Sequence, residues 1–193
     1  MRIAVLQGHP DPRCDRFCRA LAEAYGAGAL KGGHEVRTID IATLEFQLLR
    51  SADDWQNQPA PPAIRGAQDT LSWAQHVVIF FPLWMGDMPA LLKGFLEQAL
   101  RPGFALAKAS RSGLPKGLMK GRSARIVVTM GMPGFFYRLY YRAHSVKSLR
   151  RNILELAGFA PVRTSLVGMV EAKTQGVRER ALARMTMLGR KGS

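Results

Sequence analysis

The chain has 193 residues and a formal net charge of +14 at pH 7. This length suffices for one hydrophobic core and predicts a single domain over residues 1–193. Two cysteines are too few for a disulfide scaffold, and no cluster has the spacing of metal ligands, so neither a disulfide framework nor a metal site is expected. The longest apolar run, about ten residues, is too short to span a bilayer.

The positive charge belongs to the second half of the chain. Residues 1–100 contain 9 Lys and Arg against 11 Asp and Glu, a net of −2, whereas residues 101–193 contain 19 against 3, a net of +16. A field of this sign attracts polyanions such as dinucleotides, nucleic acid or an anionic membrane leaflet. Solvated basic faces that keep the protein soluble explain the same composition. No nucleic-acid partner is expected, because the basic residues form no docking motif.

The first forty residues alternate strand, loop, helix and strand. Arg2–Gln7 is a short apolar strand, and the loop Gly8–Cys14 that follows contains two prolines. Asp15 is a residue type that caps helices, so a helix is predicted from Arg16 onward. Glu35–Asp40 predicts a second strand after a glycine turn. This order is how a nucleotide-binding α/β domain begins. The apolar run near the N-terminus is too short for a signal peptide, so a cytoplasmic protein is expected.

The middle of the chain holds its central strand. Residues 53–62 are polar and proline-rich and predict a surface excursion, and residues 64–76 predict a helix. Val77–Phe81 is a run of five apolar residues, which is typical of a strand buried on both faces of a parallel sheet. After the loop Pro82–Met88, Pro89 suits the first turn of a helix with one apolar stripe. Ligands bind past the carboxyl ends of such strands, so this loop is the first place to expect a site.

The second half continues the alternation with a loop, a strand, an aromatic cluster, a helix, a strand and a basic helix. In chain order these are residues 101–120, Arg125–Met130, Phe135–Tyr141, Val146–Leu156, Pro161–Val167 and Thr174–Leu188. The helical period predicts that Leu149, Ile153 and Leu156 point inward. The aromatic cluster either fills the core or forms a subunit interface. Five strands with right-handed crossovers predict an α/β three-layer sandwich, with a flavodoxin-like parallel sheet of order 2-1-3-4-5.

Four stretches carry a family resemblance. The most specific is Phe81-Pro-Leu-Trp-Met-Gly-Asp-Met-Pro-Ala-Leu-Leu-Lys-Gly-Phe95. The others are Gly8-His-Pro10, Phe17 early in the first helix, and Lys120-Gly-Arg-Ser-Ala-Arg-Ile-Val-Val-Thr129 before the aromatic cluster. Together they resemble flavodoxin-like NAD(P)H:quinone oxidoreductases, a group similar to the ancillary oxidoreductases of potassium efflux systems and to drug-modulator quinone reductases. The resemblance covers most of the chain.

The resemblance implies two loops around the isoalloxazine ring of a flavin. The residues matched to these loops are Pro82, Leu83, Trp84, Met85, Thr129, Gly131 and Met132. A flat, largely apolar ring suits backbone amides and the face of an indole. Packing of Trp84 at the end of its strand is the alternative interpretation. Relatives often carry an acidic residue or a second glycine where this chain has Gly131-Met132-Pro133, which is a departure from the pattern.

The resemblance also implies catalytic residues and a phosphate site. Tyr137 and His144 match groups that would stabilise negative charge on the reduced flavin, although a plain surface histidine explains His144 equally well. The phosphate site comprises His9 and the start of the first helix, because a helix N-terminus presents N–H groups to an anion. Its matched residues are His9, Arg16, Phe17 and Cys18. Relatives usually have Ser-Phe-Asn at the last three positions, a second departure.

The activity that the resemblance implies is that of a flavin-dependent NAD(P)H dehydrogenase (quinone)-like enzyme. NAD(P)H would reduce the flavin, and a quinone or similar small acceptor would then oxidise it. FMN is favoured over FAD, and a homodimer with the site at the subunit interface is expected. The alternative is a regulatory flavodoxin-like module that docks on a membrane transporter or an anionic surface through the basic C-terminal half.

Overall fold

The structure is a computed structural model that describes residues 1–108, 116–171 and 175–193. Its centre is a five-stranded sheet of order β2-β1-β3-β4-β5, which confirms the predicted fold class. Every strand pair is parallel, so all carboxyl ends lie at one edge of the sheet. The strands are β1 (Arg2–Gln7), β2 (Glu35–Asp40), β3 (His76–Pro82), β4 (Ser123–Thr129) and β5 (Val162–Val167).

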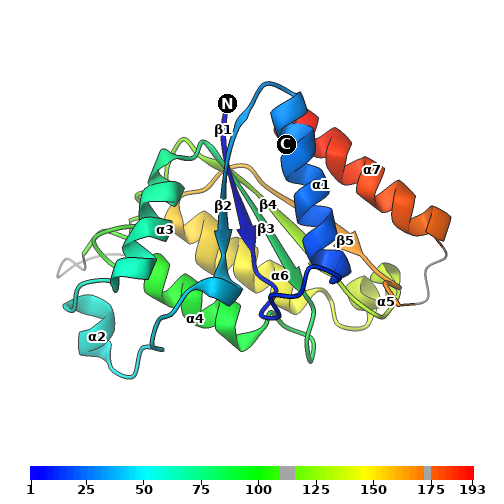
Figure 1. Cartoon of the computed structure of the whole chain (residues 1–193). Helices are drawn as coiled ribbons and strands as arrows, with labels where there is room; N and C mark the ends of the chain where they lie inside the picture. The colour runs from blue at the N-terminus through cyan, green and yellow to red at the C-terminus, as the bar shows by residue number, and fades with distance from the viewer. Residues whose placement is uncertain (109–115, 172–174) are drawn as a thin grey trace.

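Helices cover both faces of the sheet (Figure 1). One face carries α1 (Phe17–Lys31) and α7 (Gln175–Lys191), which lie side by side. The other face carries α3 (Pro62–Trp73), α4 (Ala90–Ala99) and the segment that follows α5. The short elements are η1 (Ile41–Thr43), α2 (Ala52–Gln56), α5 (Gly134–Leu139), α6 (His144–Ser148) and the π-helix η2 (Leu149–Glu155).

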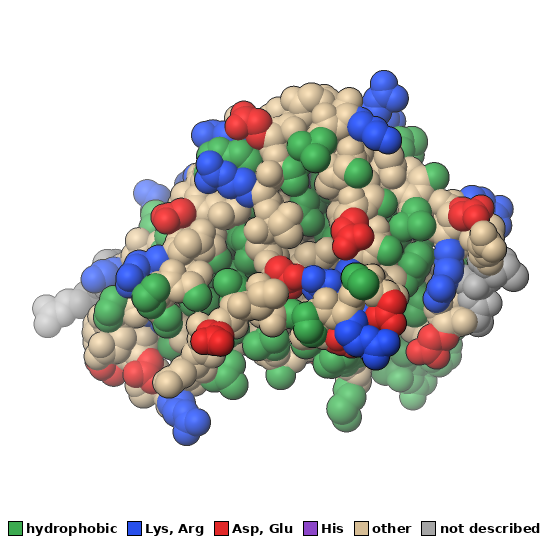
Figure 2. Space-filling model, viewed as in Figure 1, with side chains coloured by type: hydrophobic (Ala, Val, Ile, Leu, Met, Phe, Trp, Pro, Cys, Tyr) green, Lys and Arg blue, Asp and Glu red, His purple; other side chains and the backbone are tan. Residues whose placement is uncertain are grey.

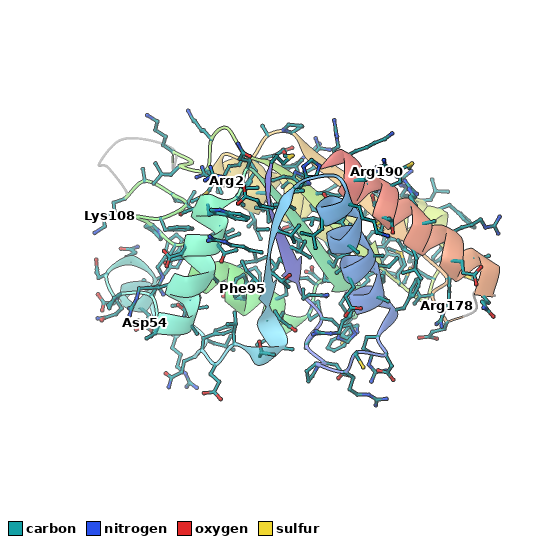
Figure 3. The ribbon with its side chains drawn as sticks, turned by 45° about the horizontal axis from the view of Figure 1, so that its top comes forward. Arg2, Asp54, Phe95, Lys108, Arg178 and Arg190 are labelled. Carbon is teal, nitrogen blue, oxygen red and sulfur yellow. The ribbon has the colours of Figure 1, made fainter. Side chains whose placement is uncertain are left out.

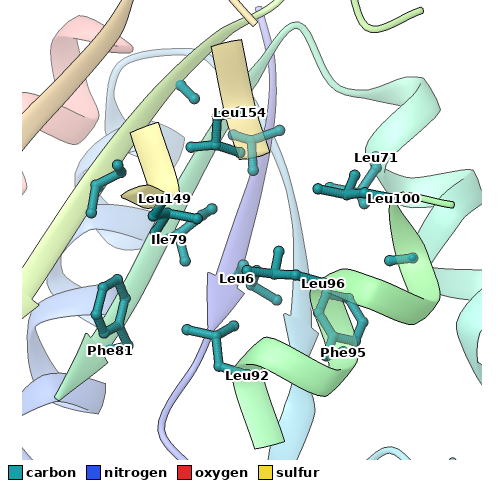
Figure 4. Close-up of a cluster of buried hydrophobic side chains, with 14 of the residues drawn as sticks. Leu6, Leu71, Ile79, Phe81, Leu92, Phe95, Leu96, Leu100, Leu149 and Leu154 are labelled. Atoms are coloured by element: carbon teal, nitrogen blue, oxygen red, sulfur yellow. The ribbon is translucent and has the colours of Figure 1, made fainter. Parts of the chain in front are cut away.

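β3 is buried along its whole length because it is the middle strand and both of its faces are covered. Successive side chains of a strand point to opposite faces. Ile79 and Phe81 therefore face the core beneath α4 and η2 (Figure 4), whereas Val78 and Phe80 face the core beneath α1. Burial of each such side chain stabilises the fold by about 1.5–3 kcal/mol. The unbroken apolar run thus supplies both cores at once.

α1 and α7 cross with their backbones in contact. A Cβ added at Gly28 would meet the backbone of Thr186, and one added at Gly189 would meet the backbone of Tyr25. Larger residues at either glycine would force the two helices apart, which commonly costs about 1–3 kcal/mol. These glycines allow α7 to lie close to α1 on the sheet.

One local prediction was wrong. Asp15 does not cap α1, because Arg16 occupies the N-cap position and no side chain caps the helix. The Asp15 carboxylate instead accepts from Arg13 Nη2 at 2.7 Å. The polar segment 53–62 lies mostly at the surface, as predicted, and it includes most of the short helix α2, which starts with a capping box formed by Ser51 and Asp54. Reciprocal capping by short polar side chains stabilises such a helix start without any apolar pattern.

The helix predicted over Val146–Leu156 consists of α6 and the π-helix η2. A π-helix bonds residue i to i+5, so side chains beyond Leu149 shift around the axis relative to an α-helix. Leu154 is therefore buried, whereas Leu156, predicted to point inward, is 38% exposed. An apolar period of 3.6 residues carries no sign of such a shift.

Parts of two predicted elements, residues 109–115 of the long loop and Thr174 of the last helix, lie outside the described residues. Both cysteines are free, with Cys14 exposed and Cys18 buried. Within the described ranges, no helix is both long and apolar enough to cross a membrane. Across the same ranges, no group of three or more His, Cys, Asp or Glu side chains could hold a metal ion.

Candidate active site

Three loops meet at the carboxyl edge of the sheet, where β1, β3 and β4 end as neighbours. The chain leaves β1 toward α1 on one face and leaves β3 toward α4 on the other, so a topological switch point lies between these strands. The Gly8 N–H donates to the Phe80 carbonyl at 2.7 Å, and the Leu83 N–H donates to the Thr129 carbonyl at 2.7 Å. These two bonds tie the three loop starts together.

The loop after β1 begins with a glycine that has no room for a side chain. A Cβ at Gly8 would lie 2.7 Å from the Phe80 carbonyl oxygen and 2.9 Å from Leu92 Cδ2. His9 follows and is mostly buried, and its Nδ1 accepts from the Asp11 N–H at 3.0 Å. Burial lowers the pKa of His9, opposed by the charge of Asp11 and helped by that of Arg16. At neutral pH His9 is therefore an uncharged imidazole whose Nε2 carries the proton.

The loop after β3 is a tight turn that projects from the sheet edge. The Trp84 N–H donates to the Asp87 carbonyl at 2.8 Å, and the Asp87 N–H donates to the Trp84 carbonyl at 2.9 Å. The two central residues, Met85 and Gly86, have φ of 49° and 83°. Positive φ at both positions is the mark of a type I′ turn, which Gly favours and Met adopts at a cost of about 1–2 kcal/mol. The turn holds Met85 fully in solvent.

Trp84 stands half exposed at the base of this turn, with 49% of its surface accessible. Its ring lies edge-on to the ring of His9, with centroids 5.8 Å apart and an interplanar angle of 83°. Trp84 is thus not a core residue, and its indole and the imidazole of His9 share one surface between β1 and β3. A planar aromatic ligand could stack there and accept a hydrogen bond from His9.

Asp87 fixes the turn to a distant part of the chain. Its Oδ1 accepts from the Met88 N–H at 2.6 Å and from the Ser145 hydroxyl of α6. Sequence reasoning missed both Asp87 and Ser145 as site residues. An Asp that ends a Met-Gly-Asp turn is a recognisable local signal, but the partnership with Ser145 joins residues 58 positions apart and has no sequence signature.

The loop after β4 is held to the end of β5. The Met130 N–H donates to the Val167 carbonyl at 3.0 Å, and the Met169 N–H donates to the Met132 carbonyl at 3.1 Å. The Thr129 side chain is buried beneath this loop. Gly131 is exposed and directly follows a strand end, so its backbone is open to a ligand at the sheet edge.

The N-terminus of α1 faces the same edge. The first N–H groups of a helix have no partner within it and attract an anion. Arg16 is the N-cap residue, and its guanidinium is already paired with a carboxylate, because its Nε donates to Asp11 Oδ2 at 2.6 Å. The Phe17 ring is partly buried beneath the Arg178 guanidinium of α7, whose carbon lies 5.1 Å from the ring centroid.

The Cys18 side chain points away from this edge into the core beneath α1. Burial raises the pKa of Cys18 to about 12, only partly offset by a hydrogen bond with Thr129 and by the charge of Arg19. The thiol is therefore neutral at physiological pH and is not a nucleophile. Only the backbone N–H of Cys18 is available to a ligand at the helix start.

The two predicted catalytic residues have different surroundings. Tyr137 is fully buried, and its hydroxyl accepts from the Val146 N–H at 3.4 Å. Burial raises the pKa of Tyr137, with hydrogen bonds from Val146 and Ser145 opposing the shift. His144 is exposed at the first residue of α6, next to the Ser145 that bonds Asp87. The structure thus brings His144, but not the Tyr137 hydroxyl, to the surface near the turn.

A large apolar surface borders the three loops. We call it the aromatic patch, and its members are Phe135, Phe136, Leu139, Tyr140 and Tyr141. Their rings pack on one another, for example Phe136 on Tyr140 with centroids 5.2 Å apart. Leu139 and Tyr140 are 76% and 71% exposed. Hydrophobic side chains also gather along the lower border of the space-filling view, below the strand ends, whereas charges of both signs intersperse above (Figure 2).

Two cavities lie away from this edge. One of about 730 Å³ is lined mainly by α2, α4 and η2, and one of about 810 Å³ is lined by residues from Leu44 to Arg101. Neither is lined by a residue of the three loops. At the strand ends, Trp84 is half exposed and Met85 is fully exposed, so this part of the site faces solvent in the single chain.

Comparison with known families agrees with this arrangement. The family described as "Flavodoxin-like fold" matches residues 1–187. The chain belongs to this family. Members share the flavodoxin-like sheet, and in a doubly wound sheet of order 2-1-3-4-5 the ligand site lies at the carboxyl edge beside the switch point. The three loops described above occupy that position.

Curated relatives resemble parts of the chain. An uncharacterized NAD(P)H oxidoreductase of Haemophilus influenzae is 28% identical over 134 residues, which cover 68% of this chain and 65% of that protein. NAD(P)H dehydrogenase [quinone] 1 of Rattus norvegicus is 27% identical over 176 residues, which cover 78% of this chain and 63% of that protein. The chain thus spans slightly less than two thirds of the length of these relatives.

Solved structures share the fold over almost the whole chain. The NAD(P)H:quinone oxidoreductase of Methanothermobacter marburgensis superposes with a TM-score of 0.81 at 22% identity, covering 99% of this chain and 96% of that one. An FMN-dependent NADH-azoreductase of Bacillus anthracis, solved with FMN, gives 0.75 at 13% identity and covers 98% of each chain. None of these similarities supports the predicted contact with a membrane or a transporter.

Proposed function

We propose that this chain is a flavin-dependent NAD(P)H oxidoreductase that reduces a quinone or a similar small acceptor. The observation that carries the proposal is the shared surface of Trp84 and His9 at the switch point between β1 and β3, beside the N-terminus of α1. The family membership and the names of the relatives support the same class of activity.

The residues at the sheet edge fit a flavin. Gly8 lets the loop after β1 pack directly against the Phe80 carbonyl and Leu92, which keeps this loop beside the loop that carries Trp84. The half-exposed indole of Trp84 suits the face of a planar ring, and the helix start suits a phosphate. When bound, a flavin would supply two-electron chemistry by accepting a hydride equivalent and passing it on.

The chain's own groups bind and orient in this proposal. Leu83, Trp84 and Met85 hold the ring, while backbone groups of Thr129, Gly131 and Met132 approach its polar edge. The N–H groups of Phe17 and Cys18 hold the phosphate. The neutral His9 donates a hydrogen bond from Nε2 to the bound ligand. Arg16 contributes a charge only when its bond to Asp11 opens.

The proton and charge roles fall on His144 rather than Tyr137. His144 is exposed at the start of α6, from which an imidazole can stabilise negative charge near the turn. The Tyr137 hydroxyl is buried against Val146, so we assign Tyr137 to positioning α6. In this assignment Tyr137 acts through Ser145, which anchors Asp87 and hence the turn that carries Trp84.

We further propose FMN as the flavin and a homodimer as the working unit. One helix start provides a single phosphate site, which matches a mononucleotide, and FMN is named for the Bacillus anthracis azoreductase. The aromatic patch borders an open site, and exposed apolar surfaces of this kind are covered in assemblies. A second copy placed there would enclose the site from water.

The dimer is tested with matched surface changes. Leu139→Glu on the aromatic patch should convert the dimer to a monomer in analytical ultracentrifugation. Leu30→Glu, at another exposed leucine, on α1, should leave the dimer unchanged. Equal behaviour of the two variants would contradict the assignment of the patch as the subunit interface.

Flavin binding is tested by titrating the purified protein with FMN and with FAD and following flavin fluorescence. Trp84→Ala should weaken FMN binding by about tenfold or more through the lost ring contact. Trp55→Ala, which removes an indole on α2 away from the three loops, should leave it unchanged. Failure of the unaltered protein to bind either flavin would overturn the proposal.

A further inference from the structure

The opposite, amino edge of the sheet carries a cluster of basic side chains. Arg125 of β4 is in register with Arg163 of β5 and with Val78 of β3, and His76 begins β3. Residues of the same parity on these strands, such as Val127, pack beneath α1 and α7. His76, Arg125 and Arg163 therefore lie on one face of three neighbouring strands.

Three buried polar atoms in this cluster have no hydrogen-bond partner among the described residues. Arg125 is only 7% exposed; its Nη1 donates to Ser165 Oγ at 2.8 Å, but its Nε has no partner within the described residues. His76 bonds Ser123 Oγ through Nδ1, and its Nε2 has no partner among the described residues. The Tyr25 hydroxyl of α1, whose pKa is affected by the charge of Arg125, also has no partner among them. Buried donors of this kind are normally satisfied, because each unmet group loses its bond to water.

The cluster also lacks negative charge. Among the described residues, no carboxylate forms an ion pair with Arg125, Arg163 or Arg184. Burial lowers the pKa of Arg125, and the charges of Arg163 and Arg184 lower it further. A guanidinium nevertheless stays charged in a protein. Like charges opposite one another on adjacent strands repel, and a buried unpaired charge is costly.

We propose that this cluster is an anion site that binds a phosphate group, held by the guanidinium groups of Arg125, Arg163 and Arg184 with His76 and Tyr25 as further donors. Arginine suits phosphate because its planar fork matches two phosphate oxygens. Arg163 and Arg184 are exposed, so the side of the cluster that faces solvent is cationic as well. The phosphate is either inorganic phosphate or the end of a phosphate monoester.

This site is separate from the one proposed for the flavin. His76 and Arg125 lie at the beginnings of their strands, whereas Trp84 and Thr129 lie at or beyond the strand ends. The proposal therefore does not depend on flavin binding. Arg190 is not a member of the proposed site, so it provides a control position for the loss of one positive charge. It lies near the C-terminal end of α7, at the opposite end of the helix from Arg178 (Figure 3).

The test is thermal unfolding with inorganic phosphate replacing chloride at constant ionic strength. Phosphate should raise the midpoint of the unaltered protein by about 3 °C or more. Arg125→Met and Arg163→Gln should abolish the shift, and Arg190→Gln, which removes the same charge, should retain it. An equal shift in Arg125→Met and in the unaltered protein would place the phosphate elsewhere, such as at α1, and would overturn the proposal.

A second measurement keeps the proposal testable if Arg125→Met does not fold. Phosphate should move the ring resonances of His76 in the unaltered protein, assigned by their loss in His76→Gln, while those of His34 stay in place. Unchanged His76 resonances at saturating phosphate would contradict the site. Repeating the titration with methyl phosphate separates the sources: an equal effect assigns a monoester end, and an effect of inorganic phosphate alone assigns the free ion.

Discussion

The two edges of the sheet differ in how their polar side chains are buried and hydrogen-bonded. At the carboxyl edge, His9 is bonded through Nδ1 to its own loop and shares an open surface with Trp84. At the amino edge, His76 and Arg125 are buried beside arginines and retain unpaired nitrogens. The first edge presents His9 and the half-exposed Trp84 to a large ligand from solvent. The second encloses unsatisfied groups that a small anion could complete.

This difference shows that an exposed group of side chains and a buried one indicate different kinds of ligand site. An open surface next to a helix start and a half-exposed indole suits a large planar ligand, whose own area then supplies the burial. A buried cationic cluster stays costly until its charge is neutralised. The same sheet can carry both, because its carboxyl and amino edges lie a strand length apart.

The largest expected effect concerns the carboxyl edge. Gly8→Val should lower the free energy of unfolding by about 3 kcal/mol and abolish FMN binding, since the new side chain would collide with the Phe80 carbonyl and Leu92. Chemical denaturation measures the first effect and an FMN titration the second. Gly66→Ala, where a Cβ meets nothing, should be neutral or slightly stabilising. Equal stability of the two variants would contradict the packing at Gly8.

The amino edge should make the protein sensitive to acid. Burial, with the charges of Arg125 and Arg163, lowers the pKa of His76 to about 4 from its ordinary 6.5. A proton binds this site more readily in the unfolded chain, so stability is full above pH 6.5 and falls as the pH drops from 6.5 toward 4.

The loss attributable to His76 should be about 2–3 kcal/mol across that window. Denaturation curves at several pH values measure it, and His76→Gln should flatten the profile there. Bound phosphate should also flatten it, because a nearby anion favours the charged imidazole. A His76→Gln profile that is as steep as that of the unaltered protein would contradict the assignment.

A smaller effect is expected where the carboxyl edge is braced. Asp87→Ala removes the acceptor for Met88 and Ser145, so it should cost about 1–2 kcal/mol of stability and weaken FMN binding roughly tenfold. Ser145→Ala should reproduce only part of the loss of FMN affinity, because Met88 keeps its bond. If Ser145→Ala leaves FMN affinity unaltered, α6 does not position the turn.

The smallest effect concerns the charge beside the helix start. Asp11→Asn should free Arg16 and remove a negative charge near the proposed flavin phosphate, raising FMN affinity by about two- to threefold. Asp15→Asn, which removes an equal charge bonded mainly to Arg13, should change the affinity less. A loss of affinity in Asp11→Asn would show that Asp11 supports the site through its bond to the Arg13 N–H.

The strands and the helical layers could be predicted from the sequence because they depend on local signals, and the strand order followed from their alternation and the right-handed crossover rule. The apolar run Val77–Phe81 alone indicates a strand buried on both faces, and the bounds of β1 and β2 were predicted to the residue. The site loops followed, since they come directly after strands. The strand order places the loops that carry His9 and Trp84 next to one another, but the contact between their rings was not predicted.

What the sequence could not predict depends on long-range contacts. Tyr137 is buried with its hydroxyl against Val146 of α6, a contact between two helices. The hydrogen bond between Asp87 and Ser145 likewise joins two separate elements. The π-helix η2 turns Leu156 outward without changing the apolar composition. The clustering of Arg125 with Arg163 depends on strand register, which a list of basic residues does not contain.

The most direct test of the central claim is an anaerobic absorbance experiment on the FMN-loaded protein. Addition of NADPH should bleach the visible flavin band, and a subsequent quinone should restore it. Trp84→Ala should lose most of this response at limiting FMN, while Trp55→Ala should retain it. A flavin band that NADPH and NADH both leave unchanged would contradict the proposed oxidoreductase function.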